Sequence, residues 1–124
     1  MQKIFLVTAS INGLLATVFG AFGAHILKTK LSPVLLSAYQ TGVQYQFYHS
    51  LALLLVGIVL FHVQNKWLDL SACLFILGII LFSGSLYLLS ITGAKWIGII
   101  TPLGGISFIL GWLFLMLGIL KIKA

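Results

Sequence analysis

Eight residues of this 124-residue sequence that could bind a ligand or carry a proton fall in four short stretches. The stretches are GAFGAH at residues 20–25, QYQFYHSLALL at 44–54, LFSGSLYLL at 81–89 and TPLGGISFILGW at 101–112. Imidazole, amide and hydroxyl groups donate and accept hydrogen bonds, so together they could form a polar layer inside the protein. The candidate members of this polar layer are His25, Gln44, Tyr48, His49, Ser83, Ser85, Tyr87 and Thr101.

Catalysis has little chemical support, because Asp69 is the only acidic residue of the chain. Paired carboxylates cannot form, and no Ser-His-Asp arrangement can assemble near the polar layer, so we expect a non-enzymatic protein. His25 and His49 could supply two ligands to a haem or a metal, but no carboxylate or thiol lies at a suitable depth to complete a metal shell. We therefore expect no cofactor, with haem or quinone binding kept as a third hypothesis.

The composition places the chain in a lipid bilayer. Hydrophobic residues make up 61% of the sequence and charged residues only 6%, with a mean hydropathy of +1.22, whereas a soluble domain carries about 25% charged residues. The net charge of +6 comes from seven lysines at the ends of apolar runs, which form no basic face. The expected partner is the bilayer and not nucleic acid, and a homo-oligomer or another membrane protein remains open.

Four apolar segments predict four transmembrane helices in a single domain covering residues 1–124. Their expected bounds are about 4–27, 33–63, 68–92 and 96–120. The connections are short, so neighbouring helices should run antiparallel. The fold class is therefore all-α, an integral membrane four-helix bundle.

The second segment is longer than a bilayer requires. Ser32 and Pro33 form a helix start, and a helix from there to residue 63 would measure about 46 Å. Its first part, about residues 33–45, is amphipathic, which favours a segment that lies near the interface or packs along the rim of the bundle and leads into the second membrane helix. One long tilted helix is the alternative.

Small residues and a proline predict close packing and a kink. In the first segment Ala9, Gly13, Ala16, Gly20 and Gly23 share one helix face, which favours a retained helix over a cleaved signal peptide. Pro102 cannot donate a backbone hydrogen bond, so a kink near residues 98–105 is expected, with hydroxyl groups satisfying the freed carbonyl. The predicted packing or kink positions are Gly13, Gly20, Gly23, Gly84, Pro102, Gly104 and Gly105.

The same four stretches, in the same order along the chain, resemble the YgdD/YwdK-like family of small membrane proteins, a domain of unknown function. The resemblance covers nearly the whole sequence. It implies a four-helix protein of the bacterial cytoplasmic membrane and brings no activity, substrate or catalytic residue.

Antiparallel helices bring all four stretches into the membrane half opposite the termini, and leave the other half mostly aliphatic. Two interpretations of this polar layer follow: it joins a kinked fourth helix to the bundle in a structural or accessory protein, or it lines a small pocket for transport or ligand binding. Four lysines lie on the side of the termini and three on the other, which weakly favours cytoplasmic termini.

Overall fold

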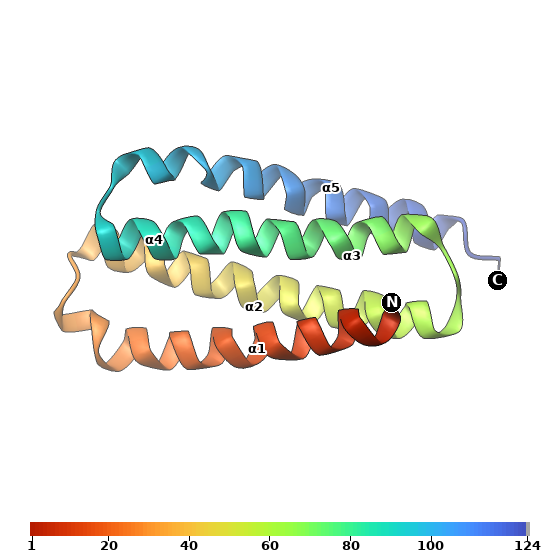
Figure 1. Ribbon diagram of the computed structural model, residues 1–124, viewed down its shortest axis with the longest axis horizontal. Helices are drawn as coiled ribbons and strands as arrows, with labels where there is room; N and C mark the ends of the chain where they lie inside the picture. Colours follow the sequence, from red (N-terminus) through yellow and green to blue (C-terminus); the bar gives the residue numbers. More distant parts are fainter. Residues whose placement is uncertain (124) are drawn as a thin grey trace.

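The computed structural model describes residues 1–123, and these form an antiparallel helical bundle (Figure 1). The order is α1 (Gln2–His25), a 3₁₀ turn η1 (Leu27–Thr29), α2 (Pro33–His62), α3 (Lys66–Gly78), a π turn η2 (Ile79–Ser83), α4 (Gly84–Thr92), a 3₁₀ turn η3 (Lys95–Ile99) and α5 (Thr101–Leu120). The described part contains no strand. Four segments are long and apolar enough to cross a membrane: Gln2–His25, Pro33–His62, Lys66–Thr92 and Lys95–Leu120. The expected all-α, four-helix membrane fold is confirmed.

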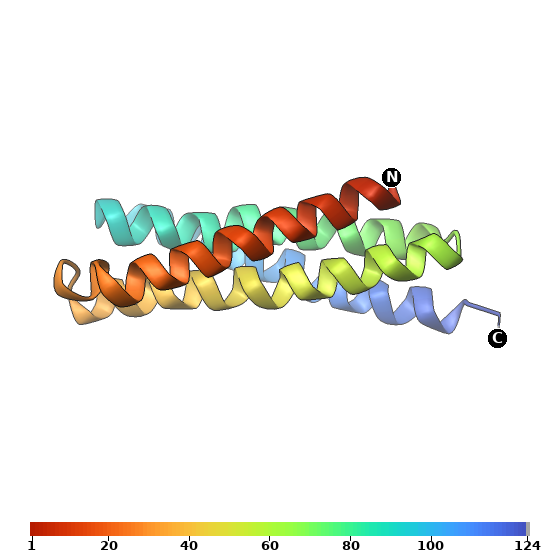
Figure 2. The ribbon, with the colours of Figure 1, turned by 90° about the horizontal axis from the view of Figure 1, so that it is seen from below.

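Both chain termini lie at the same end of the bundle. The N-terminus, the α2–α3 connection and the end of α5 lie at one end, whereas the α1–α2 and α4–α5 connections lie at the other (Figure 1). Seen from below, α1 runs obliquely across the bundle and passes in front of the third span, Lys66–Thr92 (Figure 2). The four stretches therefore approach one another from four spans, as antiparallel packing requires.

The α2 helix is continuous over 30 residues, so the amphipathic segment expected over residues 33–45 is the first part of one long helix, as in the alternative drawn from the sequence. Ser32 caps its start by accepting a hydrogen bond from the Leu35 N–H at 3.3 Å. Buried positions recur along its whole length at alternating intervals of three and four residues: Tyr39, Gly42, Gln46, His49, Leu53, Val56 and Leu60. This period is that of a helix packed along one seam. From Tyr39 onward, α2 therefore packs in the bundle along this one face.

The third span contains a π turn that the sequence did not predict. Helix α3 packs mainly on α5 before this turn, whereas α4 packs mainly on α2 after it. A π turn closes a backbone ring one residue larger than an α turn and so accommodates one extra residue. The turn lies at the point where the third span exchanges one neighbour for another.

The fourth span is interrupted before Pro102, and the kink expected around that proline takes a different form. A 3₁₀ turn covers Lys95–Ile99, and α5 begins only at Thr101, which places Pro102 in its first turn. The first turn of a helix leaves its N–H groups without intrahelical partners, so a proline loses nothing there. Gly104 and Gly105 lie within α5 and do not interrupt it.

Large side chains of the third span pack against glycines of α5 at intervals of seven residues. The pairs are Leu68 with Gly118, Phe75 with Gly111 and Phe82 with Gly104. At Gly104 the neighbour is the backbone of Phe82 in the π turn. The absence of a side chain at these three positions lets the two helices approach closely.

Two of the predicted packing glycines have no such role. A Cβ atom added at Gly13 or Gly84 would have no neighbour within 4 Å, so neither position requires a glycine for packing. Gly20 and Gly23 do face α2, since a Cβ at Gly20 would lie 3.4 Å from Val43 and one at Gly23 would overlap the Tyr39 ring. The small face of α1 is therefore narrower than the sequence pattern indicates.

Candidate functional site

The predicted polar layer is divided into separate hydrogen-bonded groups. The largest group joins three helices: the Tyr87 hydroxyl of α4 donates to Gln46 Oε1 of α2 at 2.6 Å, and Gln46 Nε2 donates to Asn12 Oδ1 of α1 at 3.0 Å. Asn12 Nδ2 in turn donates to the Thr8 carbonyl at 2.9 Å. Each amide in this chain of bonds is both donor and acceptor, which fixes the relative rotation of the three helices.

The glutamine in this network is Gln46. The sequence analysis predicts Gln44 as the member of the polar layer instead. Gln46 is 4% exposed, whereas Gln44 is exposed on the outer side of α2. The alternating three- and four-residue spacing from Tyr39 through Gly42 would have identified Gln46 as the buried one. A strict spacing of four residues, as from Leu35 through Tyr39 and Val43 to Phe47, rotates away from the buried face, because a helix has 3.6 residues per turn.

Three predicted hydroxyl residues bond between helices near the α4–α5 connection. Ser83 donates to the Gly42 carbonyl of α2 at 2.7 Å, and the hydroxyls of Ser85 and Thr101 lie 2.6 Å apart. Ser85 also donates to the Phe82 carbonyl at 2.8 Å, an acceptor in the π turn. These hydroxyls supply hydrogen-bond partners to backbone that departs from regular α geometry, as membrane helices require.

His49 uses both of its ring nitrogens within the bundle. Trp112 Nε1 donates to His49 Nε2 at 3.1 Å, which makes Nε2 the acceptor and leaves Nδ1–H to donate to the Tyr45 carbonyl at 2.8 Å. The imidazole is therefore a neutral Nδ1–H tautomer. Its ring stacks on Phe108, with centroids 3.5 Å apart and an interplanar angle of 8°. Neither nitrogen has a lone pair free for a metal or a haem iron.

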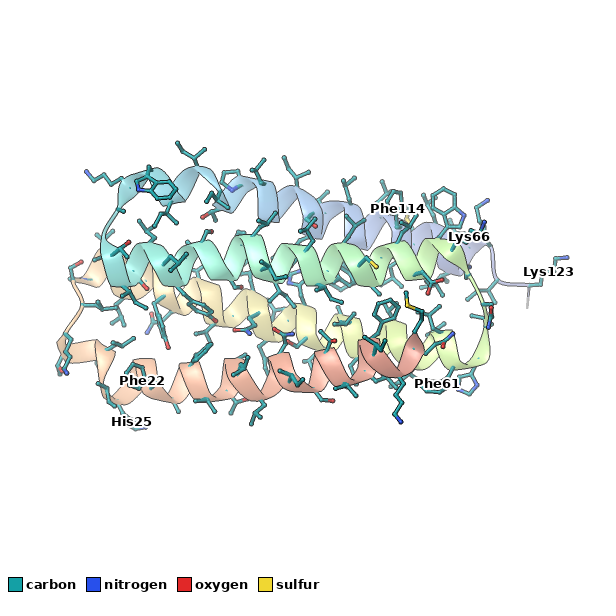
Figure 3. The ribbon with its side chains drawn as sticks, in the orientation of Figure 1. Phe22, His25, Phe61, Lys66, Phe114 and Lys123 are labelled. Carbon is teal, nitrogen blue, oxygen red and sulfur yellow. The ribbon has the colours of Figure 1, made fainter. Side chains whose placement is uncertain are left out.

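His25 and Tyr48 lie outside the hydrogen-bonded groups. His25 is exposed at the end of α1 and points away from the bundle, opposite the end that carries Phe61, Lys66 and Lys123 (Figure 3). Tyr48 is 53% exposed on the outer side of α2. The paired histidine ligands considered from the sequence are therefore not brought together, and no group of three His, Cys, Asp or Glu residues that could hold a metal exists among residues 1–123.

The half of the bundle nearer the termini is more polar inside than expected. Ser71 donates to the Gly111 carbonyl at 2.7 Å, Ser107 to the Leu74 carbonyl at 2.7 Å, and Asn65 to the Gly118 carbonyl at 2.8 Å. These bonds join the third span to α5 along the glycine-lined contact. The carbonyls of Gly111 and Gly118 are reachable because no side chain covers them.

Every buried side-chain nitrogen and oxygen in the described chain has a hydrogen-bond partner. The buried members of the polar layer are therefore all paired, whereas His25, Gln44 and Tyr48 are exposed.

An aromatic groove on the surface is lined in part by two candidate members of the polar layer, Tyr48 and His49. The groove has a volume of about 590 Å³ and opens between α2, the π turn and α5. It is lined by Tyr45, Tyr48, His49, Phe82, Gly105, Phe108, Ile109 and Trp112.

The chain is similar to several membrane proteins of bacteria. It is 43% identical to a UPF0382 membrane protein of Staphylococcus saprophyticus over 98% of this chain and all of the relative. It is 42% identical to the UPF0382 membrane protein YwdK of Bacillus subtilis, over 97% of this chain and 98% of the relative. It is 36% identical to the UPF0382 inner membrane protein YgdD of Escherichia coli K12, over 98% of this chain and 93% of the relative.

The family comparison agrees with these relatives and with the resemblance noted in the sequence. No solved structure matches the chain. A family model described as a protein of unknown function, DUF423, matches residues 19–105, which include three of the four polar stretches and the start of the fourth. With four spans and full-length relatives that are membrane proteins, the chain is a multi-pass membrane protein of the DUF423 family.

Proposed function

We propose that this protein is a non-enzymatic structural or accessory component of the bacterial cytoplasmic membrane. The observation that supports this proposal is the complete pairing of its buried polar side chains. A transport pathway or a catalytic site needs polar groups that a substrate can reach and exchange partners with. Here those groups are occupied by one another.

The identity of the paired groups strengthens the argument. Gln46, Ser83 and Ser85 are nearly inaccessible, and each bonds to a neighbouring helix or turn. Amide and hydroxyl side chains between membrane helices stabilise helix association, by about 0.6 kcal/mol on average and up to about 1.7 kcal/mol. The polar layer thereby performs a structural task, which is to set the rotation and depth of four spans.

Cysteine accessibility tests this proposal. In a Cys73→Ser background, Ser85→Cys and Thr101→Cys would be treated in membranes with a water-soluble, membrane-impermeant maleimide from each side. We expect neither variant to react, whereas His25→Cys at the exposed end of α1 reacts from one side. Elution of each variant at the wild-type position on a sizing column in detergent confirms that it is folded.

A different result would identify the alternative. Rapid labelling of Ser85→Cys or Thr101→Cys from the α1–α2 loop side would mean that the polar layer lines a water-filled pocket. That outcome would contradict the structural proposal and favour a small transport or ligand-binding protein.

A further inference from the structure

The groove between α2, the π turn and α5 has polar atoms that the bundle does not use. Of the four tyrosines, Tyr39 donates to the Phe19 carbonyl at 2.5 Å and Tyr87 donates to Gln46. Within residues 1–123, the hydroxyls of Tyr45 and Tyr48 have no hydrogen-bond partner, and their residues are 38% and 53% exposed. Both residues line the groove.

The depth of the Tyr48 hydroxyl makes its lack of a partner costly. Tyr48 is 15 residues after the start of α2 at Pro33 and 14 before its end at His62. With a rise of 1.5 Å per residue and a hydrocarbon core of about 30 Å, Tyr48 lies roughly 7 Å or more inside the core wherever the bilayer sits along α2. Acyl chains offer no acceptor there, and an unpaired hydroxyl in an apolar medium is strongly unfavourable.

The walls of the groove are flat and aromatic. The Tyr45 ring lies 4.7 Å from the Phe82 ring and 5.7 Å from the Tyr48 ring, measured between centroids. On the opposite wall, Trp112 lies edge-on to His49 at 5.9 Å. Such rings favour another planar ring as their neighbour, in offset or edge-to-face contact. The groove volume of about 590 Å³ falls within the range of small-molecule sites, about 300–1,000 Å³.

The π turn is part of the groove. It supplies Phe82, whose backbone packs on Gly104 of α5 and whose ring contacts both Tyr45 and Phe108. Single π turns in helices occur frequently at functional sites. The π turn and the unpaired hydroxyls of Tyr45 and Tyr48 therefore lie at the same groove.

We propose that this groove binds the ring of a membrane-soluble quinone-class molecule, with the apolar tail of that molecule in the bilayer. A quinone carries carbonyl acceptors on a planar ring and resides in the hydrocarbon core, whereas the ester carbonyls of phospholipids lie at the interface. Tyr45 and Tyr48 would donate to the quinone carbonyl, and the aromatic walls would stack on its ring. His49 would hold Trp112 in the wall and would not contact a metal. The groove shares Tyr48 and His49 with the predicted polar layer, but quinone binding there does not depend on whether the buried groups of that layer are closed to water.

Trp112 offers a fluorescence reporter inside the groove. The variant Trp67→Phe/Trp96→Phe leaves Trp112 as the single tryptophan of the chain. The matched control adds Trp112→Phe and Leu14→Trp, because Leu14 is exposed near the middle of α1 and outside the groove. Both proteins would be placed in liposomes and titrated with a naphthoquinone that carries a short alkyl tail.

We expect saturable quenching of Trp112 and only the linear, collisional quenching of the Leu14→Trp control. A naphthalene with the same tail and no carbonyl should bind at least fivefold more weakly, because it cannot accept the tyrosine hydrogen bonds. Tyr48→Phe should weaken naphthoquinone binding about two- to tenfold, the fold-change expected for one hydrogen bond of about 0.5–1.5 kcal/mol. Tyr39→Phe, which removes a hydroxyl outside the groove, should leave the affinity unchanged.

Filling the groove gives a second variant that does not depend on the hydroxyls. Ile109 is 67% exposed, so Ile109→Phe should fold normally and should abolish saturable quenching. Equal, linear quenching of Trp112 and the control would overturn the proposal. Saturable quenching that is unchanged in Tyr48→Phe and Ile109→Phe would also overturn it. A third contrary result is Trp112 emission that changes with protein concentration and does not respond to the naphthoquinone, because a second copy of the chain would then cover the groove.

Discussion

Gln46 shows how much a single side chain can decide at the residue scale. It accepts a hydrogen bond from Tyr87 and donates one to Asn12, so one amide sets the contacts between α1, α2 and α4. Gln44, two residues earlier, is exposed on the outer side of the same helix. The two glutamines have the same chemistry and opposite environments.

This difference leads to a prediction. Gln46→Leu keeps the volume of the side chain but leaves the Tyr87 hydroxyl and the Asn12 carbonyl oxygen without partners. We expect the free energy of unfolding to fall by about 1–3 kcal/mol, the cost of buried polar groups left unpaired. Reversible unfolding in mixed detergent micelles would measure it. Gln44→Leu is the matched control, and an equal loss in that variant would contradict the buried network.

At the scale of the elements, two adjacent glycines of α5 differ in how closely they approach the π turn of the third span. A Cβ atom at Gly104 would overlap the backbone of Phe82, which cannot move without displacing the π turn, whereas one at Gly105 would meet only the Phe82 ring at 3.9 Å. These two residues are adjacent in sequence and differ only in the direction they face.

Alanine substitution should separate them. Gly104→Ala should destabilise the protein by about 1–3 kcal/mol, because the helices must move apart to admit the methyl group. Gly105→Ala should be neutral or stabilising by up to about 1 kcal/mol, because alanine lowers the entropy lost on helix formation. Thermal unfolding of both variants in the same detergent would test this. Equal transition temperatures would contradict the close approach at Gly104.

The π turn supports a second element-scale prediction. Since it holds one residue more than an α turn, deletion of the exposed Ile80 should convert it to regular helix and leave α3 and α4 in phase. Deletion of Leu55, equally exposed but within the regular helix α2, should rotate Val56 and Leu60 away from the core by about 100°.

The two deletions should therefore differ in outcome. We expect the Ile80 deletion to yield a folded, monodisperse protein and the Leu55 deletion to aggregate on extraction. Size-exclusion chromatography and circular dichroism would distinguish them. A folded Leu55 deletion would show that the seam of α2 does not specify its rotation.

At the scale of the whole molecule, four spans place both termini on one side of the membrane. Lys3, Lys66, Lys121 and Lys123 lie on that side, and Lys28, Lys30 and Lys95 on the other. The excess of one lysine favours cytoplasmic termini only weakly, because orientation follows the difference between the two sides.

The orientation prediction can be tested with reporters. A fluorescent protein fused after residue 124 should fluoresce, and alkaline phosphatase inserted between α1 and α2 should be active outside the cytoplasm. Because the excess is so small, Lys66→Gln together with Lys121→Gln should give a mixed orientation. Phosphatase activity at the C-terminus of the unchanged chain would reverse the assignment.

Composition and the positions of the lysines were sufficient to predict four antiparallel membrane helices, because a bilayer accepts few other arrangements of apolar segments. The same patterns brought Ser83, Ser85, Tyr87 and Thr101 into one region. They could not distinguish Gln46 from Gln44, since that choice depends on the rotation of a long helix. They also did not predict the π turn, because no residue pattern in this segment distinguishes a π turn from a regular α-helix.

Tertiary structure alone decided which polar groups are sealed and which are left open. Ser85 and Thr101 meet because the fourth span is interrupted just before its proline, and His49 is occupied because Trp112 faces it from α5. Tyr45 and Tyr48, which the sequence places beside His49, remain without partners because their sides of α2 face the bilayer. Sequence thus determined the spans and their order, whereas the rotation of each helix against its neighbours determined the chemistry available at each depth.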